Sequence, residues 1–99
     1  MVAVDWRGNV VPTEFRLFQN YPNPFNATTQ LKFVTATREQ VRIEVFNVLG
    51  QHIYTVFDGV VDAGEHKVEF YGSGLSSGIY FYKLFSDKAS ITGRMVLLK

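Results

Sequence analysis

The sequence predicts an all-β domain, an immunoglobulin-like antiparallel β-sandwich of about seven short strands. Apolar and polar residues alternate with a period of two through most of the chain after residue 27, as in half-buried strands. Turn residues recur at roughly ten-residue spacing, and no window supports a helix longer than a turn. Ninety-nine residues are enough for one small domain with its own core. A small barrel is the alternative that this pattern leaves open.

The alternation assigns strands and faces in order. Strands are expected at 28–35, 40–47, 51–57, 65–71 and 79–85, with a last strand ending at Lys99. Turns are expected at 47–50, where Gly50 suits a left-handed residue, at 58–59 and at 62–64. In the most apolar strand the inward residues are expected to be Tyr80, Tyr82 and Leu84. Its outer row is Ile79, Phe81 and Phe85, beside Lys83.

Composition excludes several classes of function. Ten Lys and Arg residues against nine Asp and Glu, dispersed along the chain, provide no basic stripe for nucleic acid. No run of apolar residues is long enough to span a membrane as a helix. Cysteine is absent, which excludes disulfides and thiolate sites. Met1 is not followed by a signal-peptide pattern. Residues 1–14 are interpreted as a linker tail, with Trp6 as a remnant or a plug, and residues 15–99 as the domain.

Catalytic and metal sites find little support. Ser76 or Ser77 with His66 and Asp62 would supply triad residue types, but no nucleophile elbow surrounds these serines. Turn carboxylates at 58, 62 and 65 lack the dense alternation of acids that is typical of a calcium loop. We therefore expect no enzyme activity, no metal and no cofactor.

A proline- and asparagine-rich segment precedes the first long strand. Residues 19–33 read Gln-Asn-Tyr-Pro-Asn-Pro-Phe-Asn-Ala-Thr-Thr-Gln-Leu-Lys-Phe. Each proline fixes its own φ and biases the preceding residue toward extended conformations. Residues 19–27, here called the lead-in, are therefore expected to be stiff and extended. They are also expected to cover the outer row of strand 79–85; otherwise that row would be exposed and available to sugar rings or protein partners.

This segment resembles the "QNYPNPFNP-x-T-x-I-x-F" opening of the C-terminal sorting domains of proteins exported by the bacterial type IX secretion system. The chain departs from it at Ala27, where the family usually has proline, which is expected to loosen the turn. Residues 45–51, 63–66, 77–84 and 94–99 resemble the family's later landmarks in order. The matching motif residues are Asn20, Pro22, Asn23, Pro24, Phe25, Asn26, Gly50, Gly64, Gly78, Tyr80 and Leu84. Related modules resemble part of the flagellar hook-capping protein, but the end of this chain directly after the terminal motif favours sorting.

The resemblance implies a function and partners. The module would direct an N-terminally fused parent protein across the outer membrane, after periplasmic transit, to the cell surface or medium. Its partners would be the type IX outer-membrane translocon and a sortase-like peptidase cutting at or before the lead-in, within 10–18 or upstream. The domain is expected to be monomeric. The alternative is a non-catalytic module that attaches a parent enzyme to carbohydrate or to the cell surface.

The last strand is the expected recognition element, comprising Arg94, Met95, Val96, Leu97, Leu98 and Lys99. One apolar set, either Met95 with Leu97 or Val96 with Leu98, should be buried. The other set, with Arg94 and Lys99, would form an apolar patch framed by positive charge, or its strand edge would accept a strand from the partner. A central, covered last strand is the alternative. Polar replacement of residues 95–99 is expected to abolish export while the rest of the fold persists.

Overall fold

The computed structural model describes residues 2–4, 10–12 and 15–99, the first two stretches by their backbone only. The described residues form strands and connecting turns. The strands are β1 (Val2–Val4), β2 (Val10–Pro12), β3 (Arg16–Leu17), β4 (Thr28–Thr35), β5 (Glu39–Phe46), β6 (His52–Val61), β7 (Gly64–Tyr71), β8 (Gly78–Ser86) and β9 (Ser90–Leu97). No helix capable of crossing a membrane occurs in these described ranges.

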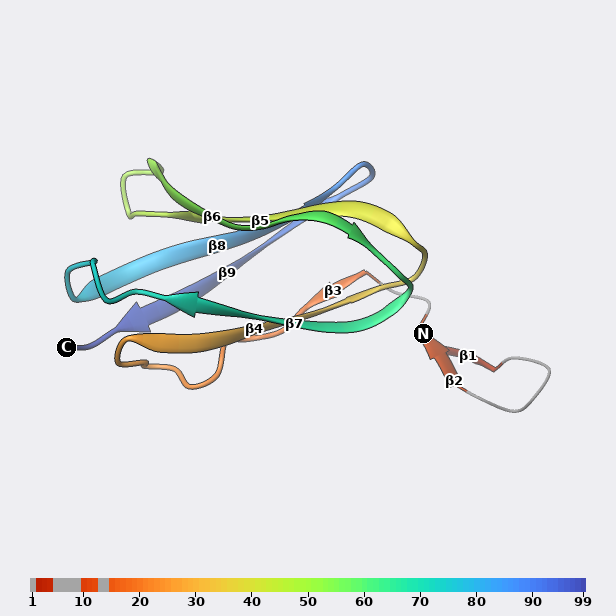
Figure 1. Cartoon of the computed structure of the whole chain (residues 1–99), viewed down its shortest axis with the longest axis horizontal. Helices are drawn as coiled ribbons and strands as arrows, with labels where there is room; N and C mark the ends of the chain where they lie inside the picture. Colours follow the sequence, from red (N-terminus) through yellow and green to blue (C-terminus); the bar gives the residue numbers. More distant parts are fainter. Residues whose placement is uncertain (1, 5–9, 13–14) are drawn as a thin grey trace.

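Seven of these strands form two facing antiparallel sheets (Figure 1). The three-stranded sheet has the order β3-β4-β7, and the four-stranded sheet has the order β6-β5-β8-β9. The β6–β7 connection passes from one sheet to the other, as sandwich folds require. The predicted fold class is confirmed: the chain is an immunoglobulin-like β-sandwich. β1 and β2 pair with each other as a separate two-stranded sheet.

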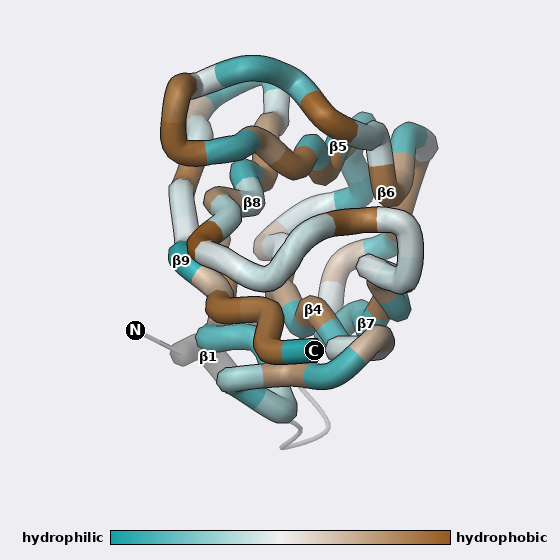
Figure 2. Tube along the Cα trace, turned by 90° about the vertical axis from the view of Figure 1, so that its left-hand side faces the viewer, coloured by the Kyte–Doolittle hydropathy of each residue, from teal (hydrophilic) through white to brown (hydrophobic). Residues whose placement is uncertain are grey.

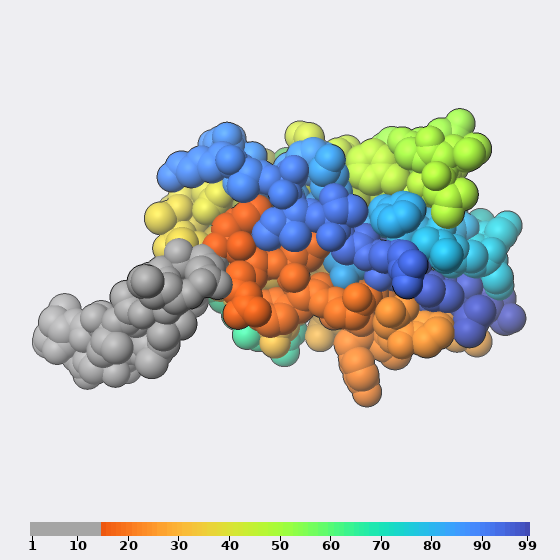
Figure 3. Space-filling view, turned by 180° about the vertical axis from the view of Figure 1, so that it is seen from behind, coloured from red at the N-terminus to blue at the C-terminus, as the bar shows by residue number. Residues whose placement is uncertain are grey.

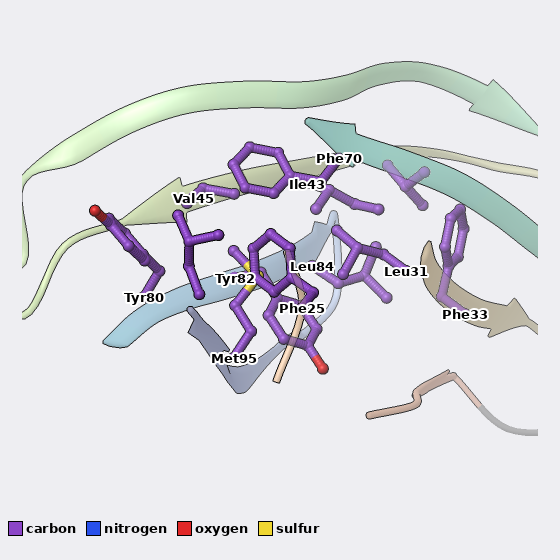
Figure 4. Close-up of a cluster of buried hydrophobic side chains, with 12 residues drawn as sticks. Phe25, Leu31, Phe33, Ile43, Val45, Phe70, Tyr80, Tyr82, Leu84 and Met95 are labelled. Carbon is purple, nitrogen blue, oxygen red and sulfur yellow. The ribbon is translucent and has the colours of Figure 1, made fainter. Parts of the chain in front are cut away.

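The core lies between the two sheets and follows the predicted alternation (Figure 4). β4 contributes Leu31 and Phe33, and β7 contributes Phe70. From the other sheet come alternate residues of β5, β8 and β9: Val41, Ile43, Val45, Tyr80, Tyr82, Leu84, Met95 and Leu97. Every side chain of this group is less than a tenth exposed, so the core is continuous across both sheets.

The β5–β6 turn is confirmed and the turn at 58–59 is wrong. Gly50 has a φ of 80°, which glycine adopts without a steric penalty. The Asn47 side-chain oxygen accepts hydrogen bonds from the backbone N–H groups of Leu49 and Gln51. At the second position β6 continues to Val61, with Gly59 opposite Val41. Cross-strand pairing with β5 over this length outweighs the local turn preference of the Asp-Gly pair.

Some predictions fall outside the described residues. Trp6 is one of them, so its role is not addressed by the structure. The boundary between a tail and a domain at residues 14 and 15 stays a prediction.

Candidate recognition site at the C-terminal strand

The last strand presents two different faces. Met95 and Leu97 are fully buried in the core, whereas Val96 is partly exposed and Leu98 is 54% exposed. The separation of the two apolar sets is therefore confirmed. Polar replacement of all of 95–99, however, would place polar groups at two core positions. That the fold survives this replacement stays a prediction, and the burial of Met95 and Leu97 argues against it, because burying unpaired polar groups is costly.

β9 lies at the edge of its sheet, and the lead-in covers the C-terminal half of that edge. Figure 3 shows the orange lead-in lying against the blue last strand. Phe25 N–H donates to the Val96 carbonyl, and Leu98 N–H donates to the Phe25 carbonyl, each at 2.9 Å. The Asn23 side-chain oxygen accepts from Val96 N–H at 3.0 Å, and Gln19 Nε2 donates to the Arg94 carbonyl at 2.7 Å.

This pairing overturns two interpretations. β9 is not a central strand, because it pairs with β8 on one side only and borders the sheet on the other. Its C-terminal half is also not a free edge, because the lead-in already bonds the backbone groups that a partner strand would need.

The lead-in is bent rather than extended. Tyr21 pairs with Gln30 of β4, and Phe25 pairs with Leu97 of β9, so the segment crosses from one sheet to the other within a few residues. The Tyr21–Pro22 and Asn23–Pro24 peptide bonds are both cis. The expectation of an extended segment considered only the local proline preference, whereas pairing at both ends requires a bend.

A buried polar network holds the start of the bend. Asn20 is 2% exposed, and its Nδ2 donates to Thr29 Oγ1 and to the Pro22 carbonyl, each at 3.0 Å. Its backbone N–H donates to the Tyr82 hydroxyl, which in turn donates to the Phe18 carbonyl, each at 2.9 Å. The network therefore joins the lead-in to β4 and β8 together, since buried polar groups must be paired.

Phe25 fixes the other end of the bend. Its ring is 1% exposed and packs edge-on to Phe70, with centroids 6.2 Å apart (Figure 4). It also closes over Gly72, where an added Cβ would lie 3.2 Å from the ring. The lead-in thus contributes to the core between the sheets. The expectation that it covers the outer row of β8 is wrong. Ile79 of that row is 40% exposed.

Ala27, where the chain departs from the family pattern, lies two residues after Phe25. It has a φ of 74°, and its carbonyl accepts a hydrogen bond from Gly72 N–H at 2.6 Å. Proline has φ locked near −65° and cannot adopt this conformation. Alanine at this position is therefore compatible with a backbone that the more common proline would exclude.

The C-terminus is attached to the β7–β8 loop. Lys99 N–H donates to Ser77 Oγ at 2.9 Å, and Lys99 Nζ donates to the Ser73 carbonyl at 2.7 Å. The β5–β6 hairpin, this loop and Lys99 all lie at one end of the sandwich, here called the C-terminal end (Figure 1). Phe15 enters at the opposite end, since β3 pairs with Phe33 and Val34 near the end of β4.

Exposed apolar side chains gather at the C-terminal end. Of the large hydrophobic residues that are exposed in the described ranges, all but Val60 lie toward this end, on the strand ends and loops that meet there. They are Tyr21, Val48, Leu49, Tyr54, Tyr71, Ile79 and Leu98. Figure 2 looks onto this end and shows hydrophobic stretches beside the C-terminus. These exposed side chains divide among different faces. Tyr21 borders a hollow on the outer face of the three-stranded sheet, and Tyr54 and Tyr71 border another beside the β7–β8 loop. Ile79 lies opposite Val96 of β9.

The remaining motif residues open strands, face the core or flank Phe25. Gly64 opens β7 and Gly78 opens β8, while Tyr80 and Leu84 face the core. The Tyr80 hydroxyl donates to the Ser76 carbonyl at 2.7 Å. Pro24 and Asn26 are exposed on either side of Phe25.

Sequence reasoning missed three participants. Thr29 is 1% exposed and donates to the Pro22 carbonyl. The Gln19 side chain bonds β9, as described above. A Cβ at Gly93 would lie 2.3 Å from the Tyr82 ring. A glycine inside a strand is a signal of such a close approach.

Burial raises the pKa of the Tyr82 hydroxyl, while its hydrogen bond from the Asn20 N–H acts in the opposite direction.

The catalytic residue types do not converge. His66 lies near the start of β7 and bonds the Asp62 backbone carbonyl through Nε2, whereas Ser76 and Ser77 follow the far end of β7. The carboxylates considered for a metal have other partners: Gln40 for Asp58, Arg38 for Asp62, and Lys32 and Lys67 for Glu65. Within the described part of the chain, no group of three or more potential metal ligands forms.

A family model described as "Secretion system C-terminal sorting domain" matches residues 19–98. The chain therefore belongs to this family of C-terminal sorting domains. Its function is that of a sorting signal for the type IX secretion system, which exports proteins to the cell surface or extracellular space.

A solved structure is also similar. It is that of PorZ, described as an essential bacterial surface component of the type-IX secretion system of Porphyromonas gingivalis. The TM-score is 0.62 at 16% identity, over 84% of this chain and 11% of that one. At this identity the likeness supports the fold. No match was found among curated proteins.

Proposed function

We propose that the secretion machinery reads the folded C-terminal end of the sandwich, centred on the outward side chains of residues 94–99. The observation that carries the proposal is the division of β9. Met95 and Leu97 anchor the strand, while Val96 and Leu98 face outward next to Arg94. Ile79, which lies opposite Val96 in register and is 40% exposed, adds to this outward apolar surface.

In this proposal the partner is the type IX outer-membrane translocon, which the parent protein reaches through the periplasm. The parent is joined upstream, at the end where Phe15 enters, so the C-terminal end is free to dock. The module is monomeric, non-catalytic and without a cofactor. A sortase-like peptidase then removes it. Because Arg16 and Leu17 pair with β4, a cut before Arg16 would leave the sandwich intact.

The test is export of a reporter. The whole chain is fused behind a periplasm-exported fluorescent protein in a host with type IX machinery, with and without residues 98–99. These two residues lie beyond β9, so the core remains in the shortened form. We expect surface or medium fluorescence with the full chain and strong periplasmic retention without them. Equal export of both forms would contradict recognition at this end, and retention of the module on mature protein would favour a binding module.

A further inference from the structure

The outer face of the four-stranded sheet carries a groove beside the C-terminal end. A hollow of about 300 Å³ is lined by Phe46, Asn47, Val48, Gly50, Phe81, Lys83 and Thr92. Phe46 lies opposite Phe81 in the β5–β8 register, and Lys83 lies opposite Thr92 in the β8–β9 register. The floor is therefore aromatic, and the walls supply a cation, an amide and a hydroxyl.

Apolar residues continue the groove toward the chain end. Phe81 is followed on the outer face by Ile79, and Ile79 lies opposite Val96 in register. Val48 at the hairpin tip is 64% exposed and forms the wall on the other side. Together these residues form an apolar path from the β5–β6 hairpin to the last strand, and Phe46, Val48 and Phe81 of this path line the hollow.

The charge around this path is positive. Lys83 lines the hollow, and Arg94 lies opposite Phe81 in register. Among the described residues, neither cation has a carboxylate within ion-pair distance. Glu44 is opposite Lys83 in register, but its carboxylate pairs with Arg42 at 3.3 Å and with His52 at 3.2 Å. Lys83 Nζ instead lies over the Phe85 ring, 5.2 Å from its centroid, so its charge faces an aromatic ring and not a carboxylate.

We propose that this groove binds an extended segment of a protein partner that presents apolar and acidic side chains on the same face. The proposal rests on the sorting function above and names a second contact of the same end. Apolar side chains would enter over Phe46 and Phe81, and carboxylates would meet Lys83 and Arg94. A second copy of this chain would bring the same positive face, so like charges would oppose self-pairing.

The direct test is an NMR titration of the 99-residue chain with defined probes. The first probe is a blocked octapeptide in which leucine and aspartate take turns at the odd positions and serine fills the even ones, and the second has lysine in place of aspartate. The third is a neutral hexasaccharide. We expect the acidic peptide alone to shift the amide signals of the groove, with an affinity that falls as salt rises. No shift, an equal response to the lysine peptide, or a response to the saccharide alone would overturn the proposal.

Matched variants test whether the charge of Lys83 contributes to peptide binding in the groove. Lys83→Glu should weaken binding of the acidic peptide about tenfold, because it replaces attraction by repulsion. Val48→Asp should weaken it as well, and Lys83→Arg should preserve it. The control is Lys88→Glu, an exposed lysine in the β8–β9 turn at the other end. If Lys88→Glu weakens binding as much as Lys83→Glu, general charge attraction is sufficient and the site is wrong.

The reporter fusion separates this inference from the function on which it rests. Lys83→Glu and Val48→Asp should each retain the reporter in the periplasm, while Lys88→Glu is exported. Normal export of both groove variants would overturn the groove as a sorting contact and leave recognition through residues 94–99 standing. Failure of the unmodified chain to be exported would instead contradict the proposed function, while the peptide titration would still decide the groove.

Discussion

Removing the Phe25 ring should destabilise the domain more than any other change in the lead-in. The ring is 1% exposed and fills space between the sheets against Phe70 and Gly72. Truncating such a phenylalanine to alanine costs about 3–5 kcal/mol. Domains of this size are stable by only about 5–15 kcal/mol. Phe25→Ala should therefore remove a large fraction of the unfolding free energy and lower the melting temperature by at least about 12 °C.

The assay is urea unfolding followed by circular dichroism, combined with amide hydrogen exchange. The N–H groups of Val96 and Leu98 bond the lead-in, so Phe25→Ala should accelerate their exchange more than that of Met95, which pairs with β8. Tyr21→Ala is the control, because that ring is 79% exposed and its loss should change stability by less than about 0.5 kcal/mol. A loss below about 1 kcal/mol for Phe25→Ala would refute the assignment of the lead-in to the core.

Substitutions at three further positions test the interior and the lead-in. Gly93→Ala should cost about 1–3 kcal/mol in urea unfolding, because the new methyl group would clash with the Tyr82 ring; an unchanged midpoint would show that the close approach is wrong. The raised pKa of Tyr82 means that its stabilising contribution is present below about pH 10 and is lost as pH rises through the folded-state value. Tyr82→Phe should therefore flatten the fall in stability at alkaline pH. It should also lower the unfolding free energy at pH 7 by about 1–3 kcal/mol, because the Asn20 N–H and the Phe18 carbonyl lose their partner. An unchanged fall in stability at alkaline pH would contradict this. Ala27→Gly should raise the melting temperature, because glycine accepts a positive φ more readily, whereas Ala27→Pro should lower it; the reverse order would refute the backbone assignment.

The sandwich was largely predictable because burial imposes a strict period of two. The inward face assigned to residues 79–85 is the one that the structure buries, and the strands expected at 28–35 and 40–47 correspond to β4 and β5. The turn at Asp58 and Gly59 was predicted wrongly because its signal is local, while β6 is defined by its long pairing with β5. Local preference identifies a turn only where no partner strand competes for the same residues.

The lead-in could be recognised from its residues but not built from them. Its proline spacing indicates a restricted backbone. The bend, however, depends on pairing with β4 at Tyr21 and with β9 at Phe25, and these two strands are far apart in sequence. The same limit applies to the groove. Phe46, Phe81 and Lys83 come together only through the β5–β8 register, which alternation alone does not provide.

The central claim is that export depends on the outward side chains of a folded C-terminal end. Val96→Ser with Leu98→Ser changes only the outer set of the last strand and leaves Met95 and Leu97 in the core. Val60→Ser, at an exposed apolar position away from this end, is the matched control. The decisive measurement is the exported fraction of the fluorescent fusion for each variant, with folding verified by circular dichroism. We predict periplasmic retention of the folded double variant and normal export of Val60→Ser; equal export of both would contradict the claim.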